Sequence, residues 1–99
     1  EATSIARQIT ARREEDRQAI AAKLRRISAR ALELHDKLFH RPIVTVPAVE
    51  KMLGVNYQHA NRLISSLEEI GLLREITGGR RNRRFGYAAY LALLTADEM

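Results

Sequence analysis

Side chains suited to binding nucleic acid gather in one segment of this sequence, residues 56–71. Amide and guanidinium groups can read base edges, and hydroxyl groups can hold phosphates. The polar residues of the segment that we predict to contact DNA are Asn56, Tyr57, Gln58, His59, Arg62 and Ser65. The simpler interpretation is a solvated polar surface. For Tyr57 an equally good alternative is packing beside Val55, where it would cover the preceding turn.

An amphipathic helix is predicted to position these residues. Asn56 can cap its first turn, and Gly71 can take the left-handed conformation that ends a helix. Apolar residues recur in the segment at spacings of three and four, which places them on one face. They are Ala60, Leu63, Ile64, Leu67 and Ile70. We therefore expect Leu63 and Leu67 to be buried and the polar residues to face away from the core. Asn61 lies between the two faces, where it can bond to the backbone of the preceding turn.

A second cluster of basic residues lies in the run GGRRNRR, residues 78–84. The glycine pair indicates a turn between two strands, Leu72–Thr77 and Arg83–Tyr87. Like charges without an acid among them repel, and DNA phosphates would neutralise them. The predicted DNA-binding residues of this run are Arg80, Arg81, Arg83 and Arg84. A solvated hairpin tip is the alternative, because loops are often charged.

Other chemistry is not indicated by the sequence. The histidines are His35, His40 and His59, and no cysteine is present to join them in a metal site. The acidic run at residues 14–16 is interpreted as solvated helix surface, and the glycine pair leads into a hairpin, unlike a phosphate-binding loop. We therefore assign no catalytic residue, no metal ligand and no cofactor.

The remaining elements predict a mainly α fold with a small β-hairpin. Residues 2–39 lack glycine and proline and read as helix, with a possible bend near residues 22–25. An apolar stripe, Ile20–Leu38, suits either core packing or a coiled-coil seam. A short strand at 43–46, a helix that starts near Pro47 and ends at Gly54, and a closing helix at 88–94 complete the order of a winged helix-turn-helix.

Three parts of the chain are predicted. They are a helical arm at 1–26, the winged helix-turn-helix at 27–94, and a tail at 95–99. The polar residues 10–18 of the arm are expected either to be solvated or to pack on a preceding domain.

Composition favours an anionic partner. The chain has 99 residues, a formal net charge of +5 and a pI near 10.2. Such a balance points to nucleic acid first and a membrane surface second. No apolar run approaches the roughly 20 residues that cross a bilayer. Since cysteines are absent, disulfides are excluded, and we expect a cytoplasmic protein.

Several of these motifs together resemble the C-terminal winged-helix module of the Fic (filamentation induced by cAMP) family. They are PIVTV (42–46), LGVNYQHANRLI (53–64), GGRRNRRFGY (78–87) and AYLALL (89–94). The resemblance covers about residues 27–94 and implies that a Fic domain precedes this chain. Fic domains transfer AMP or a similar group to protein hydroxyls through an H-P-F-x-[DE]-G-N-G-R loop. That motif is absent here, so the resemblance implies no catalytic role for this chain.

Two functions remain open from the sequence. One is a DNA-binding module that targets or regulates a Fic protein. The other is a protein-interaction module, in which the Ile20–Leu38 stripe forms a homodimer or docks on the Fic domain. Acidic residues at Glu68, Glu69 and Glu75 would oppose DNA if they share its face.

Overall fold

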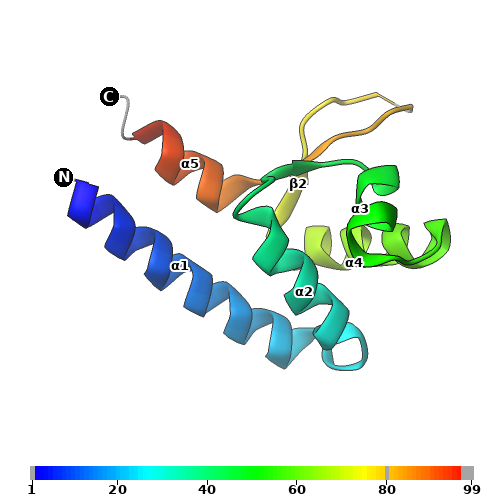
Figure 1. The fold of residues 1–99 in the computed structure, drawn as a ribbon, viewed down its shortest axis with the longest axis horizontal. Coiled ribbons are helices and arrows are strands. Elements are labelled where there is room, and N and C mark those ends of the chain that lie inside the picture. The colour runs from blue at the N-terminus through cyan, green and yellow to red at the C-terminus, as the bar shows by residue number, and fades with distance from the viewer. Residues whose placement is uncertain (1, 80, 97–99) are drawn as a thin grey trace.

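The protein folds into five α-helices and a small sheet in the residues that the computed structural model describes, 2–79 and 81–96 (Figure 1). The helices are α1 (Ala2–Lys23), α2 (Ser28–Leu38), α3 (Val46–Leu53), α4 (Tyr57–Glu69) and α5 (Ala88–Ala96), with a 3-10 turn at Arg25–Ile27. The strands are β1 (Ile43–Val44), β2 (Leu73–Glu75) and β3 (Phe85–Tyr87). This order confirms the predicted mainly α winged helix-turn-helix with an N-terminal helical arm.

The sheet is antiparallel and has the strand order β1-β3-β2. β3 is therefore the central strand, and Phe85 lies between Val44 on one side and Glu75 on the other. Pairing continues past β2, where the Ile76 N–H donates to the Arg84 carbonyl at 2.9 Å. The loop at 76–84, which we call the wing, extends from this sheet beside α3 and α4, on the side of the molecule away from α1 (Figure 1).

Local signals set the ends of the two helices of the helix-turn-helix. The Asn56 side chain accepts from the His59 N–H at 2.8 Å, and Gly54 and Gly71 adopt φ values of 65° and 83°. All three roles match the sequence prediction. The start of α3 differs, because Val46 is helical and Thr45 is the N-cap, accepting from the Ala48 N–H at 3.2 Å.

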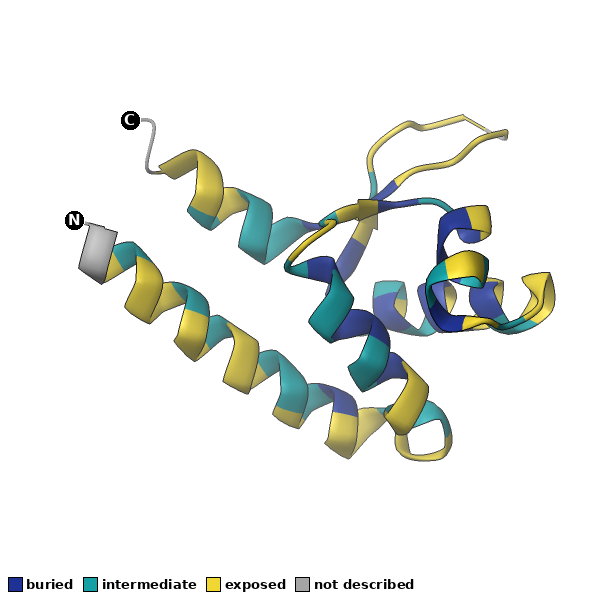
Figure 2. Cartoon of the chain, viewed as in Figure 1, coloured by how far each residue is buried: buried dark blue, intermediate teal, exposed yellow. Residues whose placement is uncertain are grey.

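The core lies where α2, α3, α4 and the sheet meet, as the dark blue regions of Figure 2 show. Leu63 and Leu67 are both fully buried, as predicted. The apolar stripe of residues 20–38 also packs in this core, since Ile20, Leu34 and Leu38 have no exposed surface. That stripe is therefore not available as a dimer seam.

Residues 10–18 of the arm are mostly exposed, as expected, but α1 also packs with its other side on the chain's own winged domain. It contacts α2 and α5, and Arg13 and Arg17 both pair with Asp36 of α2. The chain reverses after α1 at Leu24, which ends the helix within the region where a bend was expected. The division into arm and domain at residue 26 stays a prediction.

A buried hydrogen-bonded chain fixes the arm to the sheet. The Tyr87 hydroxyl donates to Asp16 Oδ2 at 2.5 Å and lies 2.9 Å from His35 Nε2. Asp16 therefore does not belong to a solvated surface, and its side chain is only 14% exposed. Because the hydroxyl hydrogen points to the carboxylate, Nε2 must carry the hydrogen that His35 gives to Tyr87. His35 Nδ1 is buried and has no hydrogen-bond partner among the described residues, which favours the neutral ring with its hydrogen on Nε2.

Acid should destabilise the protein through His35. Burial lowers the pKa of His35 below the ordinary 6.5. The carboxylates of Asp16 and Asp36 raise this pKa, and the guanidinium groups of Arg17 and Arg13 lower it, but burial is the largest effect. The unfolded chain then binds a proton at a higher pH than the folded one, so the free energy of unfolding falls as pH drops below about 6.5. Urea unfolding between about pH 7 and pH 5 measures this loss, because that window lies above the ordinary pKa values of Asp and Glu.

The control for that experiment is His35→Gln, which keeps a hydrogen-bond donor for Tyr87 but does not titrate. Its stability should change much less over the same pH range. Equal slopes for the variant and the wild type would contradict the assignment to His35.

No helix within the described ranges combines the length and apolar character needed to cross a membrane.

Candidate nucleic-acid interface

The polar face of α4, which we define as Gln58, Arg62 and Ser65, is exposed along its length. These positions recur at four and three residues, so they lie in one row opposite the buried Ala60 and Leu67. His59 is half-buried and lies at the edge of this row. The structure therefore brings three of the predicted residues together in an arrangement that a groove of DNA can accept.

The two residues at the start of α4 have different roles. Asn56 uses its side-chain oxygen to cap the helix, so its predicted contact with DNA is restricted to the amide nitrogen. Tyr57 does not cover the turn, because it is 57% exposed and faces the wing. It is among the few large apolar or aromatic side chains left exposed in the described residues.

The wing carries its arginines in two different states. Arg81 and Arg84 are exposed. Arg83 instead binds Glu75 Oε1 at 2.7 Å, and its guanidinium lies 5.1 Å from the centre of the Phe85 ring. Strand register explains this, because Glu75 is opposite Phe85 and Arg83 precedes Phe85 by two residues on the same face. Arg80 lies outside the described residues.

The ion pair affects the ionisation of both partners. The hydrogen bond from Arg83 holds the pKa of Glu75 below its ordinary value, and the same bond raises the pKa of Arg83. Both groups therefore stay charged at neutral pH, and each neutralises the other. Arg83 is less available to an outside phosphate than Arg81 or Arg84.

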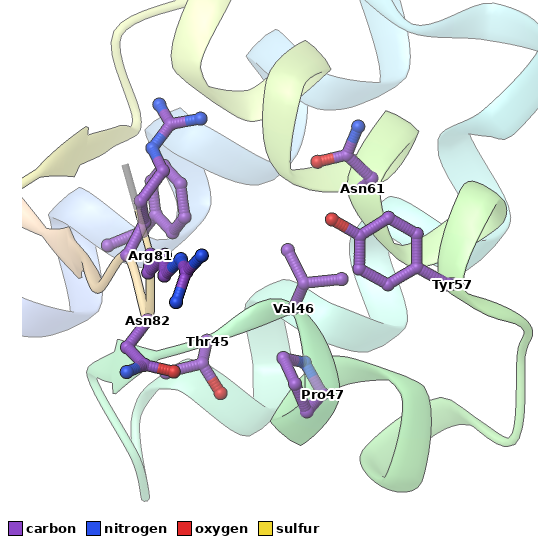
Figure 3. A pocket seen from close by; sticks show the side chains of 9 residues that line it. Thr45, Val46, Pro47, Tyr57, Asn61, Arg81 and Asn82 are labelled. Carbon is purple, nitrogen blue, oxygen red and sulfur yellow. The ribbon is translucent and has the colours of Figure 1, made fainter. Parts of the chain in front are cut away.

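A groove of about 410 Å³ separates α4 from the wing. From α4 the Tyr57 hydroxyl and the Asn61 carboxamide point across it toward the wing, with Val46 and Pro47 between (Figure 3). The lining consists of Thr45, Val46, Pro47, Tyr57, Asn61, Arg81, Asn82, Arg83 and Phe85. This groove joins the two predicted DNA-binding regions into one surface.

Sequence reasoning did not assign Thr45 or Asn61 to this surface. Among the described residues the Asn61 side chain has no hydrogen bond to the backbone, and it is exposed in the groove. Its spacing of four from Tyr57 was the available signal, because residues at i and i+4 share a helix face. Thr45 could have been found as the threonine that precedes a Val-Pro pair at a helix start.

Acidic residues limit the surface at one end. Glu69 is exposed and lies one turn beyond Ser65, at the end of the polar face of α4. Glu75 is paired with Arg83. DNA contacts are therefore expected from the first three turns of α4, away from Glu69. Within the described ranges, no cluster of three or more histidine and acidic side chains is arranged to hold a metal ion.

Comparison with known proteins identifies the same region. Residues 31–87 match the model of a family described as "HTH DNA binding domain". The fold is similar to the crystal structure of a MarR family transcriptional regulator from Silicibacter pomeroyi DSS, with a TM-score of 0.58 and 18% identity. The similarity covers 93% of this chain but 61% of that protein, so this chain spans about three fifths of its length. No curated protein matches the sequence significantly.

Proposed function

The chain belongs to the family of helix-turn-helix DNA-binding domains, and from this premise we propose that α4 enters the major groove while the wing holds flanking phosphates. The observation that carries this proposal is the single groove lined both by α4 and by the wing arginines. A rigid helix beside a basic loop allows base edges and backbone to be contacted at once. The protein thus acts as a transcription-regulator-like binding module.

The polar face of α4 supplies the groups for base recognition. An amide such as that of Gln58 can bond to adenine in a bidentate manner, and a guanidinium such as that of Arg62 can do so with guanine. His59 and Ser65 flank them and can add single hydrogen bonds. Arg81 and Arg84 are exposed in the wing, and they add attraction that is independent of sequence.

Replacing Arg62 by Ala should weaken binding to a preferred duplex by about 1–3 kcal/mol and binding to random DNA much less. A preferred duplex is first selected from a random pool, and fluorescence anisotropy then gives affinities at several salt concentrations. Arg26→Ala is the matched control, because Arg26 is an exposed arginine in the 3-10 turn away from α4. Wild-type binding no tighter than that of any basic protein would refute the DNA proposal.

Replacing Glu75 by Gln should strengthen binding to all DNA, because it frees Arg83 for a phosphate. The slope of log K against log salt should steepen by about 0.9 for the added contact. Glu33→Gln is the matched control, since it also releases an arginine from an ion pair, Arg30 at 2.9 Å, but on α2. If both variants change the slope equally, the effect belongs to net charge and not to the wing.

The motif resemblance supports a finer proposal about biological context. We propose that the module follows a Fic domain in a longer cytoplasmic protein, and that it targets that protein to DNA or regulates its synthesis. Any transfer of AMP would then be carried out by the preceding domain. The support is the set of motifs shared across residues 42–94, and no residue of this chain is given a catalytic role.

A protein-interaction module is the second candidate, and α5 is the observation that favours it. Its described residues carry no charge, none of them is buried, and Leu94 remains 39% exposed. An apolar helix of this kind is usually covered, by a second copy or by the preceding Fic domain. This candidate predicts that binding to DNA is weak and that replacing Gln58 has no effect on it.

A further inference from the structure

The groove between α4 and the wing contains hydrogen-bond donors and cations but no carboxylate in its lining. Besides Thr45, Asn82 and Arg83, three polar side chains line it from two elements: Tyr57 and Asn61 from α4, and Arg81 from the wing. No hydrogen bond or ion pair engages the ends of these side chains within residues 2–79 and 81–96, whereas Arg83 is engaged by Glu75. Among the described residues of the lining, Arg81 is therefore the cation that can pair with a ligand.

The surroundings of these side chains also favour an anion. Thr45, Val46 and Pro47 form the first turn of α3, and they line the same groove. The start of a helix carries partial positive charge. Val46, Pro47 and Phe85 present apolar surface that a deoxyribose ring can contact. The chemistry of the groove is thus that of a phosphodiester site: a charged, donor-rich centre with apolar walls.

We propose that this groove holds one particular backbone phosphate of DNA, bound jointly by Arg81, Tyr57 and Asn61. The guanidinium pairs with the phosphate oxygens, while the hydroxyl and the amide nitrogen donate to them. Because the donors come from both α4 and the wing, a phosphate held here sets the position of the polar face of α4 along the duplex. This inference rests on the proposed DNA-binding function.

Shared use of one phosphate predicts that the side chains are energetically coupled. Tyr57→Phe and Arg81→Ala should each weaken binding to the preferred duplex about 10-fold or more, the usual effect of losing a hydrogen bond to a charged group. The fold loss of affinity in the double variant should be smaller than the product of the two single fold losses, because either change already impairs the same contact. Arg74→Ala is the control for lost charge, since Arg74 is exposed on the neighbouring strand outside the groove.

Neutral phosphate substitution locates the site on the DNA. Single methylphosphonate linkages are placed one at a time along the preferred duplex. At one position the methylphosphonate should reduce the affinity of the wild type about as much as Arg81→Ala reduces affinity for the unmodified duplex. On the duplex modified at that position, Tyr57→Phe should cause little further loss. Multiplicative effects in the double variant, together with the absence of such a position, would overturn the proposal while leaving DNA binding intact.

A titration with inorganic phosphate separates this inference from the proposed function. Amide and side-chain NMR signals of Tyr57, Asn61 and Arg81 are followed in the wild type and in Arg81→Ala. If the wild type binds no DNA but shows saturable shifts that Arg81→Ala lacks, the DNA function fails and the anion site holds a free phosphate or phosphorylated small molecule. If neither DNA nor phosphate binding is found, both proposals fail.

Discussion

Leu67→Ala should destabilise the protein by about 2–5 kcal/mol, because it leaves a cavity at the centre of the core. Leu67 is fully buried on α4, and α4 packs on α2, α3 and β2. A domain of this size has a total stability of about 5–15 kcal/mol. At about 4–8 °C per kcal/mol, the melting temperature should fall by at least roughly 8 °C. Thermal unfolding followed by circular dichroism measures this shift.

Leu94→Ala is the matched control for this substitution. Leu94 lies on α5 and is 39% exposed, so the same change should cost about 1 kcal/mol or less. Similar melting temperatures for the two variants would show that the buried face of α4 is wrongly assigned.

Tyr87→Phe should have the second largest effect, because one hydroxyl joins three elements. Its removal leaves His35 Nε2 without its partner and takes the hydrogen from Asp16 Oδ2. Each buried polar group left without a partner costs about 1–3 kcal/mol, so we expect a total loss of about 2–4 kcal/mol. The ring stays in place against Phe39, so the loss is attributable to the hydroxyl.

Tyr90→Phe provides the comparison. Its hydroxyl donates to the Phe39 carbonyl at 3.2 Å from a half-buried position, and its loss should cost about 0.5–1.5 kcal/mol. Hydrogen exchange adds a local measurement, since only Tyr87→Phe should increase exchange along α1. Equal destabilisation by the two variants would contradict a role for Tyr87 in holding the arm.

The sequence was sufficient for α4 and for the helix-turn-helix, because their signals are local. The cap at Asn56, the apolar spacing and the stop at Gly71 all lie within one short segment, and the structure confirms each of them. The wing followed from the glycine pair and the flanking strand patterns for the same reason.

Contacts distant in sequence could not be predicted in the same way. Asp16 and Tyr87 are 71 positions apart, and His35 and Tyr87 are 52 apart. No spacing rule connects such residues, so the arm was expected to be solvated or to pack elsewhere. The pairing of Arg83 with Glu75 depends on strand register, which the turn sequence did not determine. That pairing makes Arg83 the wing arginine that is less available to DNA than Arg81 or Arg84.

The position of β3 in the sheet has a consequence for synthesis of the protein on the ribosome. β3 is the central strand but the last to be made, and its residues pair with both β1 and β2. Chains emerge N-terminus first at about 5–20 residues per second. While residues 85–87 are still in the exit tunnel, β1 and β2 have no strand between them, and Asp16 and His35 lack Tyr87. The nascent chain can therefore form its helices and the contacts of α1 with α2 early. The wing closes, and the Tyr87 hydroxyl joins Asp16 and His35, only after β3 has emerged.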